Sequence, residues 1–146
     1  MLDSNAISEK SFDVITLLGV LSIFDDVEPA LTNLIRWTKP NGKLFIHGMF
    51  NPENIDVFLK YRSSDDYGDQ IFESGWNIIS QNTIKNILNK NGITSFVFHK
   101  FDISIDIPKN VGDSVRSWTE QMDNGKRIIT NGLCLIQPHY LLEINI

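Results

Sequence analysis

The chain of 146 residues has a single cysteine, Cys134, and no run of basic residues. One cysteine cannot form an internal disulfide, and this composition is compatible with a reducing, cytoplasmic location. Thirteen basic residues stand against 18 acidic ones, which leaves a formal net charge of −5. An acidic chain without a basic face is not expected to bind nucleic acid nonspecifically.

Long apolar runs are also missing. No segment approaches the ~20 residues that cross a bilayer, and the N-terminal MLDSNAISEKS lacks the apolar core of a signal peptide. We therefore expect no contact with a membrane. The three histidines and the one cysteine stand at unrelated spacings, so we also expect no metal site.

The clearest positive pattern begins at Phe12 and continues almost without polar residues to Val20. Such a segment predicts a strand buried on both faces, as in parallel sheets covered by helices. Glu28 opens a segment with apolar residues at helical spacing, and Lys39-Pro40-Asn41-Gly42 ends it. Residues 44–50 predict a second strand. Two strands joined through one helix should run parallel with a right-handed crossover.

Weaker patterns follow this unit. They predict a short helix within residues 51–59, a helix from Ser80 to Asn91, a strand over 95–107, a short helix through Val115, Trp118 and Met122, and a closing strand over 133–146. No internal repeat or shift in composition marks a boundary, so residues 1–146 are expected to form one domain.

Three motifs in the first unit carry a family resemblance. They are Phe12-Asp13-Val14-Ile15, Gly19-Val20-Leu21, and the run from Leu34 through Pro40-Asn41-Gly42-Lys43-Leu44. With the closing Asn-Gly-Leu-Cys-Leu-Ile-Gln-Pro-His-Tyr-Leu-Leu-Glu-Ile, they resemble the C-terminal half of a class I S-adenosylmethionine (SAM)-dependent methyltransferase. The resemblance covers roughly Ser11 to Ile146. It implies an α/β, Rossmann-like half-sheet of parallel strands with a terminal antiparallel strand and flanking helices.

The first half of that family's domain has no counterpart here. In the family a Gly-x-Gly loop follows the first strand, but no two of the nine glycines in this chain are separated by one residue. The resemblance therefore implies an incomplete domain. In the family the first strand lies beside the strand that matches Phe12–Leu18, so this strand becomes an open, apolar edge. We expect a missing N-terminal half, a companion chain or a second copy to cover it.

The resemblance also places SAM across the carboxyl end of that strand. The candidate cofactor-binding residues are Asp3, Leu18, Gly19, Val20 and Phe24. Asp3 would match the family's acidic residue that reaches the adenine amino group. Apolar residues at such a place are also ordinary core, and Asp25 and Asp26 are expected to cap the following helix.

His47, near the end of the second strand, is the candidate catalytic residue. It could act as a general base that removes a proton from an acceptor hydroxyl or amine. A lone histidine on a strand is more often a hydrogen-bonded core residue, and His99 and His139 are expected at the surface. The candidate residues for the acceptor are Phe50, Tyr61, Tyr67 and Trp76. The alternative for these aromatic residues is a small hydrophobic cluster under a long loop.

The function that follows is methyl transfer from SAM to a small-molecule acceptor. Because half of the cofactor site is absent, the isolated chain is expected to be inactive. Two alternatives stay open: a non-catalytic methyltransferase-like partner or dimerising half domain, and an unrelated Rossmann-like fragment.

Overall fold

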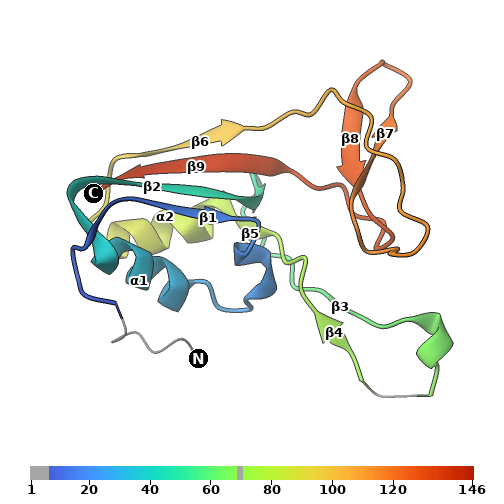
Figure 1. Ribbon diagram of the computed structural model, residues 1–146, viewed down its shortest axis with the longest axis horizontal. Helices are drawn as coiled ribbons and strands as arrows, with labels where there is room; N and C mark the ends of the chain where they lie inside the picture. Colours follow the sequence, from blue (N-terminus) through green and yellow to red (C-terminus); the bar gives the residue numbers. More distant parts are fainter. Residues whose placement is uncertain (1–6, 69–70) are drawn as a thin grey trace.

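The computed structural model describes residues 7–68 and 71–146 (Figure 1). Its main sheet has four long strands in the order β1 (Phe12–Leu18), β2 (Thr38–Asn51), β9 (His139–Asn145) and β6 (Phe96–Lys100). β1 and β2 are parallel, and β9 runs antiparallel to both of its neighbours. The short β5 (Ile79–Ser80) pairs with the end of β2. The expected half-sheet with one antiparallel strand is confirmed.

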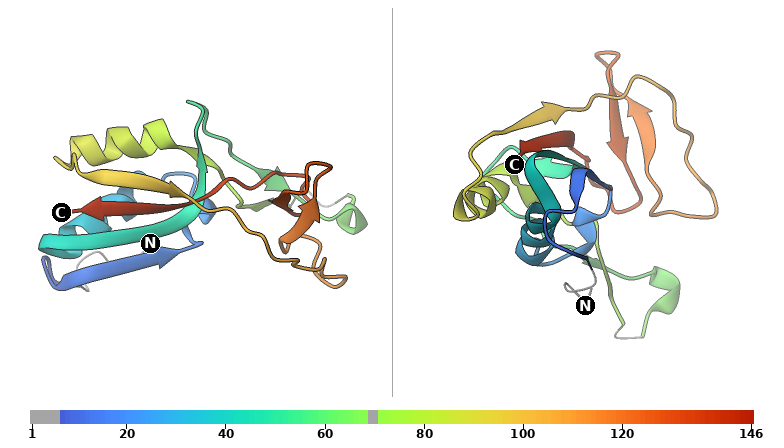
Figure 2. Two further views of the ribbon diagram at one scale, coloured as in Figure 1. Left: turned by 90° about the horizontal axis from the view of Figure 1, so that it is seen from above. Right: turned by 60° about the vertical axis from the view of Figure 1, so that its left-hand side comes forward.

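Two helices, α1 (Glu28–Trp37) and α2 (Gln81–Lys90), pack on one face of this sheet (Figures 1 and 2). The core fills the space between the helices and the sheet. Its fully buried aliphatic residues are Leu31, Leu44, Ile46, Ile84, Leu88, Leu142 and Ile144. Alternate strand residues such as Phe45 and Leu141 point to the other face and are only partly buried. No described helix covers that second face.

The edge strand β1 is more exposed than its sequence predicts. The exposed fractions of Phe12, Val14 and Leu18 are 43%, 54% and 62%. The expected burial on both faces is therefore wrong for the described residues, because β1 has only β2 beside it and no helix over its second face. Asp13 lies on this edge, where Lys39 at 2.9 Å holds the pKa of the carboxyl below its usual range. Among the described strands β1 pairs with β2 alone, so the open edge expected at Phe12–Leu18 is confirmed for this part of the chain.

The connection from α1 to β2 is a bulge rather than a loop. Thr38 pairs with Phe12, residues 39–42 bulge outward, and pairing resumes between Val14 and Lys43. Asn41 has a positive φ of 66° within this bulge. The Pro-Asn-Gly motif thus ends the helix as predicted, but the strand already begins at Thr38.

The segment after β2 forms no helix within 51–59, so that prediction is wrong. The Asn51 side chain donates to the carbonyl of Ile55 and accepts from the amide of Glu53, which closes a local turn in place of a helix. An arm follows, with β3 (Lys60–Tyr61), a 3₁₀ turn (Ser64–Asp66) and β4 (Glu73–Ser74). The predicted helix from Ser80 is confirmed as α2, because Ser80 Oγ accepts from the Thr83 amide.

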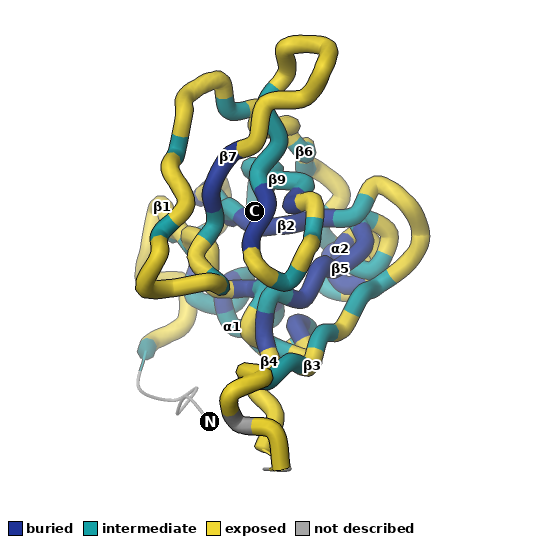
Figure 3. The backbone as a smooth tube through the Cα atoms, turned by 90° about the vertical axis from the view of Figure 1, so that its right-hand side faces the viewer, coloured by how far each residue is buried: buried dark blue, intermediate teal, exposed yellow. Residues whose placement is uncertain are grey.

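Residues 101–138 form a lobe beyond the end of the sheet (Figure 1). Its centre is a hairpin of β7 (Trp118–Gln121) and β8 (Arg127–Thr130), so the short helix predicted here is wrong. Gly125, with a φ of +78°, lies in the turn of the hairpin. Figure 3 shows this lobe as largely exposed. Its buried residues are Trp118, Thr119, Thr130, Asn131 and Gln137.

The two outer strands are shorter than predicted. β6 stops at Lys100, and β9 begins at His139 rather than at Leu133. Cys134, expected inside a strand, is exposed in a turn with a φ of +58°. Neither helix of the described chain has the length and apolar content of a membrane span.

Candidate functional site

The carboxyl ends of β1 and β2 meet at one edge of the sheet, beside the start of β9. β1 ends at Leu18, and the next amide, of Gly19, donates to the carbonyl of His47 at 2.9 Å. A 3₁₀ turn (Leu21–Ile23) follows. We call residues 18–23 the β1 exit. In open α/β sheets this edge is where ligands bind.

Apolar side chains of the β1 exit face solvent. Leu18, Val20 and Ile23 are all exposed, and Leu21 alone among the aliphatic residues is buried. Gly19 has a φ of +71°, and a Cβ built on it would meet nothing within 4 Å. A ligand can therefore approach the backbone here directly. Ile23 was not anticipated from the sequence.

The other candidate cofactor residues lie elsewhere. Phe24 is partly buried and packs against the core. Asp3 is outside the described residues. The β1 exit thus presents exposed apolar side chains and an open glycine backbone beside β1, which pairs with β2 alone among the described strands.

Asn77 fixes the segment that follows the β1 exit. This side chain is fully buried (0% exposed). Its Nδ2 donates to the carbonyl of Phe24 and to Oδ1 of Asp25, both at 3.0 Å, and its Oδ1 accepts from the Leu59 amide at 2.9 Å. The expected helix cap at Asp25 is thus wrong, because its carboxylate bonds Asn77, whereas Asp26 does accept from the Glu28 amide. No sequence pattern pointed to Asn77.

The candidate base His47 is paired with a second histidine. Its Nε2 lies 3.2 Å from Nδ1 of His139, and the two ring planes are inclined by 13°. Phe101 packs edge-on against His47 at a centroid distance of 5.9 Å. On the far side, His139 Nε2 lies 3.2 Å from Oε1 of Gln137.

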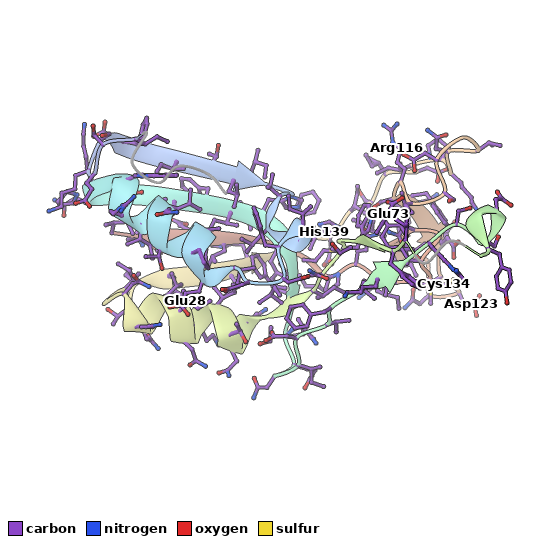
Figure 4. The ribbon with its side chains drawn as sticks, turned by 90° about the horizontal axis from the view of Figure 1, so that it is seen from below. Glu28, Glu73, Arg116, Asp123, Cys134 and His139 are labelled. Carbon is purple, nitrogen blue, oxygen red and sulfur yellow. The ribbon has the colours of Figure 1, made fainter. Side chains whose placement is uncertain are left out.

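The surface position expected for His139 is wrong. His139 is partly buried at the junction of the sheet and the hairpin lobe (Figure 4). Burial, and then the charge of His47, lowers the pKa of His139 to about 4. Burial also lowers the pKa of His47. Both rings are therefore neutral near neutral pH. His99, in contrast, is exposed as expected.

The candidate acceptor residues do not form one cluster. Phe50 is fully buried in the core, where it packs edge-to-face on Phe98 at 5.3 Å. The Tyr61 hydroxyl donates to Glu73 at 3.0 Å, and burial together with this carboxylate raises its pKa. Tyr67 is exposed on the arm, and Trp76 adopts a positive φ of 59° just beyond β4.

Comparisons with known proteins agree with this architecture. Residues 2–95 match the sequence model of the family described as "Methyltransferase domain". The chain belongs to this family, and the alternative of an unrelated Rossmann-like fragment is thereby wrong. The comparison with curated proteins finds no match.

Three solved structures share the fold, and the first two are described as SAM-dependent methyltransferases. A structure from Methanosarcina mazei aligns with a TM-score of 0.55 at 10% identity and covers 96% of this chain and 61% of that one. A structure from Archaeoglobus fulgidus gives 0.52 at 13% identity and covers 98% and 63%. The YcgJ protein from Bacillus subtilis gives 0.51 at 15% identity and covers 95% and 65%. The chain has a class I methyltransferase fold and spans about three fifths of the length of these proteins.

Proposed function

We propose that this chain is the C-terminal portion of a SAM-dependent methyltransferase that acts on a small-molecule acceptor. The observation that carries the proposal is the β1 exit. It combines an open glycine backbone and exposed apolar side chains at the carboxyl end of an edge strand. Family membership gives methyl transfer as the general reaction. The cytoplasm is the proposed location.

In this proposal Leu18, Gly19 and Val20 hold one side of the cofactor, with Phe24 behind them in the core. The bound cofactor supplies a methyl group already activated for transfer, so the protein contributes mainly by holding the reactants in line. His47 would accept the proton that an acceptor hydroxyl or amine loses. Asp3 remains a candidate for the adenine.

The aromatic arm is the proposed cover of the acceptor. Tyr61 and Tyr67 lie on it, and Trp76 joins it to β5. Phe50 supports the end of β2 from inside the core. Phe50 would then contribute by packing only, and the other three aromatic residues would lie beside the acceptor.

The remaining contacts to the cofactor are proposed to come from residues that pair with β1. They belong to an N-terminal half of the same polypeptide, to a companion chain or to a second copy. A non-catalytic partner that docks through the same edge is the alternative.

Titration with SAM tests the cofactor assignment. We expect the isolated chain to bind more weakly than about 100 µM, because half of the pocket is missing. The amide resonances that shift should belong to residues 18–23. Gly19→Ala should weaken binding further. Gly125→Ala is the matched control, since both glycines have positive φ and open surroundings.

Two results would contradict the assignment in different ways. Micromolar binding by the isolated chain would mean that no half-site is missing. Saturating shifts that leave residues 18–23 untouched would remove the β1 exit from the cofactor site.

Light scattering after size exclusion tests the open edge. We expect the parent chain to self-associate. The Val14→Lys variant on β1 should have the molar mass of a monomer, because a charge on an edge strand opposes strand pairing. Val97→Lys is the control. Val97 on β6, the other edge of the sheet, is 52% exposed against 54% for Val14. Equal effects of both substitutions, or a monomeric parent chain, would refute self-association through β1.

A further inference from the structure

We propose that His139 is a positioning residue that holds His47 with its proton on Nε2, so that Nδ1 of His47 is the nitrogen that serves as base. Gln137 and Ser117 in turn fix His139. The functional role that we give to this arrangement rests on the proposed methyl transfer. The arrangement of protons is a property of the chain alone and can be tested without substrate.

The orientation of the Gln137 amide sets the direction of the hydrogen bonds: its Oε1, which can only accept, faces Ser117 and His139, and its buried Nε2 has no hydrogen-bond partner among the described residues. The Ser117 hydroxyl donates to Oε1 of Gln137 at 2.9 Å. The same oxygen lies 3.2 Å from Nε2 of His139 and accepts from it. Gln137 is 4% exposed, so water competes little for this oxygen. A neutral imidazole has one N–H, and with that proton on Nε2 the Nδ1 of His139 carries a lone pair.

That lone pair faces His47. The distance from His139 Nδ1 to His47 Nε2 is 3.2 Å, and the two rings stack with centroids 5.0 Å apart and planes inclined by 13°. The two nitrogens are therefore within hydrogen-bond distance of each other. His47 therefore carries its own proton on Nε2, and its Nδ1 is unprotonated. Within the described residues no atom is hydrogen-bonded to this Nδ1.

The pair is arranged to take up one proton. When Nδ1 of His47 is protonated, its Nε2–H stays bonded to the neutral His139, and a hydrogen bond from a cation is stronger than a neutral one. A second proton would have to enter at His139 Nδ1, which breaks this bond and places two charges within 3.2 Å in a partly buried site.

The charged groups near the histidine pair do not change which ring is protonated first. Glu143 lies further along the same sheet face and is paired with Lys43 at 2.8 Å and with His99 at 3.3 Å. A surface hollow beside His139 is lined by charged groups that also have partners: Lys100 pairs with Asp102, and Arg127 pairs with Asp106. No described carboxylate contacts either ring of the histidine pair.

A metal site is the competing use of two adjacent imidazoles. Structural and catalytic zinc sites take at least three protein ligands. The described residues hold no group of three or more histidine, cysteine or acidic side chains that could surround a metal ion. Proton transfer is therefore the use that the geometry supports.

Nitrogen-15 spectra of the histidine rings near neutral pH test the proposal on the chain itself. We expect both His47 and His139 to carry their proton on Nε2. His139→Phe keeps an aromatic ring but removes the acceptor, so His47 should lose its tautomer preference and its pKa should fall by about one unit. Gln137→Leu removes the oxygen that accepts from Nε2 of His139, so His139 should lose its preference for the Nε2–H tautomer. Gln137→Glu, which keeps an oxygen acceptor, should retain it.

His47 with its proton on Nδ1 in the parent chain would overturn the proposal, and this result needs no variant to fold. An unchanged tautomer and pKa of His47 in a folded His139→Phe chain would also overturn it. Neither readout involves SAM. A chain that fails to bind SAM but shows the expected tautomers would count against the proposed function only.

Discussion

Gly42→Ala is expected to lower the free energy of unfolding by about 3 kcal/mol, the upper range for overpacking a tight site. A Cβ built on Gly42 would lie 2.6 Å from Cγ2 of Thr38, 2.8 Å from the carbonyl oxygen of Asp13 and 2.9 Å from that of Lys39. Two of these three atoms are backbone, so they cannot move without displacing β1 from β2. Urea unfolding followed by circular dichroism measures the loss.

Gly48→Ala is the matched control because Gly48 lies in the same strand. Its nearest neighbour would be the Phe50 ring at 3.6 Å, an ordinary contact. We expect no loss, and a gain of up to about 1 kcal/mol, since alanine costs less chain entropy than glycine. Thr38→Ser combined with Gly42→Ala should recover part of the loss, because it removes the closest atom. Equal effects at Gly42 and Gly48 would contradict the steric account.

Asn77→Ala is expected to cost about 3 kcal/mol, because it removes three hydrogen bonds and leaves two partly buried backbone groups without partners. The groups left unpaired are the Leu59 amide and the Phe24 carbonyl. The segment after the β1 exit would then lose its tie to the rest of the fold. Hydrogen exchange should show faster opening of residues 21–25, together with a lower unfolding midpoint.

Two further substitutions separate this role from a general effect of losing an amide. Asn77→Asp keeps the acceptor for Leu59 but removes both donors and places a second carboxylate beside Asp25, so it should cost at least as much as Asn77→Ala. Asn145→Ala removes one exposed hydrogen bond to Ser95 and should cost less than about 1 kcal/mol. A similar cost at Asn77 and Asn145 would exclude the proposed anchoring role.

Local patterns in the sequence predicted the sheet half that carries the site. β1, α1, β2 and α2 each follow from an apolar period with a turn signal at its end. The hairpin lobe was mispredicted because Trp118 and Met122 are spaced as on a helix face. The Asp123-Asn124-Gly125 turn between β-prone segments was the better signal.

The site itself was predictable only where it depends on a strand end. The position of the β1 exit could be predicted because the apolar run that begins at Phe12 ends there. The pairing of His47 with His139 joins residues 92 positions apart. It arises from the antiparallel register that sets His139 opposite Met49, and a single sequence contains no information about that register. Asn77 was missed for the same reason, because its side-chain partners come from two segments far from it in the sequence, residues 24–25 and Leu59.

The position of β9 also determines the order in which this sheet can assemble during synthesis. β9 lies between β2 and β6, although both of those strands precede it in the chain. Until residues 139–145 have left the ribosome, β6 has no neighbour among the described strands, and the edge of β2 that pairs with β9 is open. The last step of sheet assembly therefore inserts β9 between β2 and β6. Contacts over such long sequence separations slow folding. A nascent chain arrested before Leu133 should accordingly depend on chaperones far more than the released protein does.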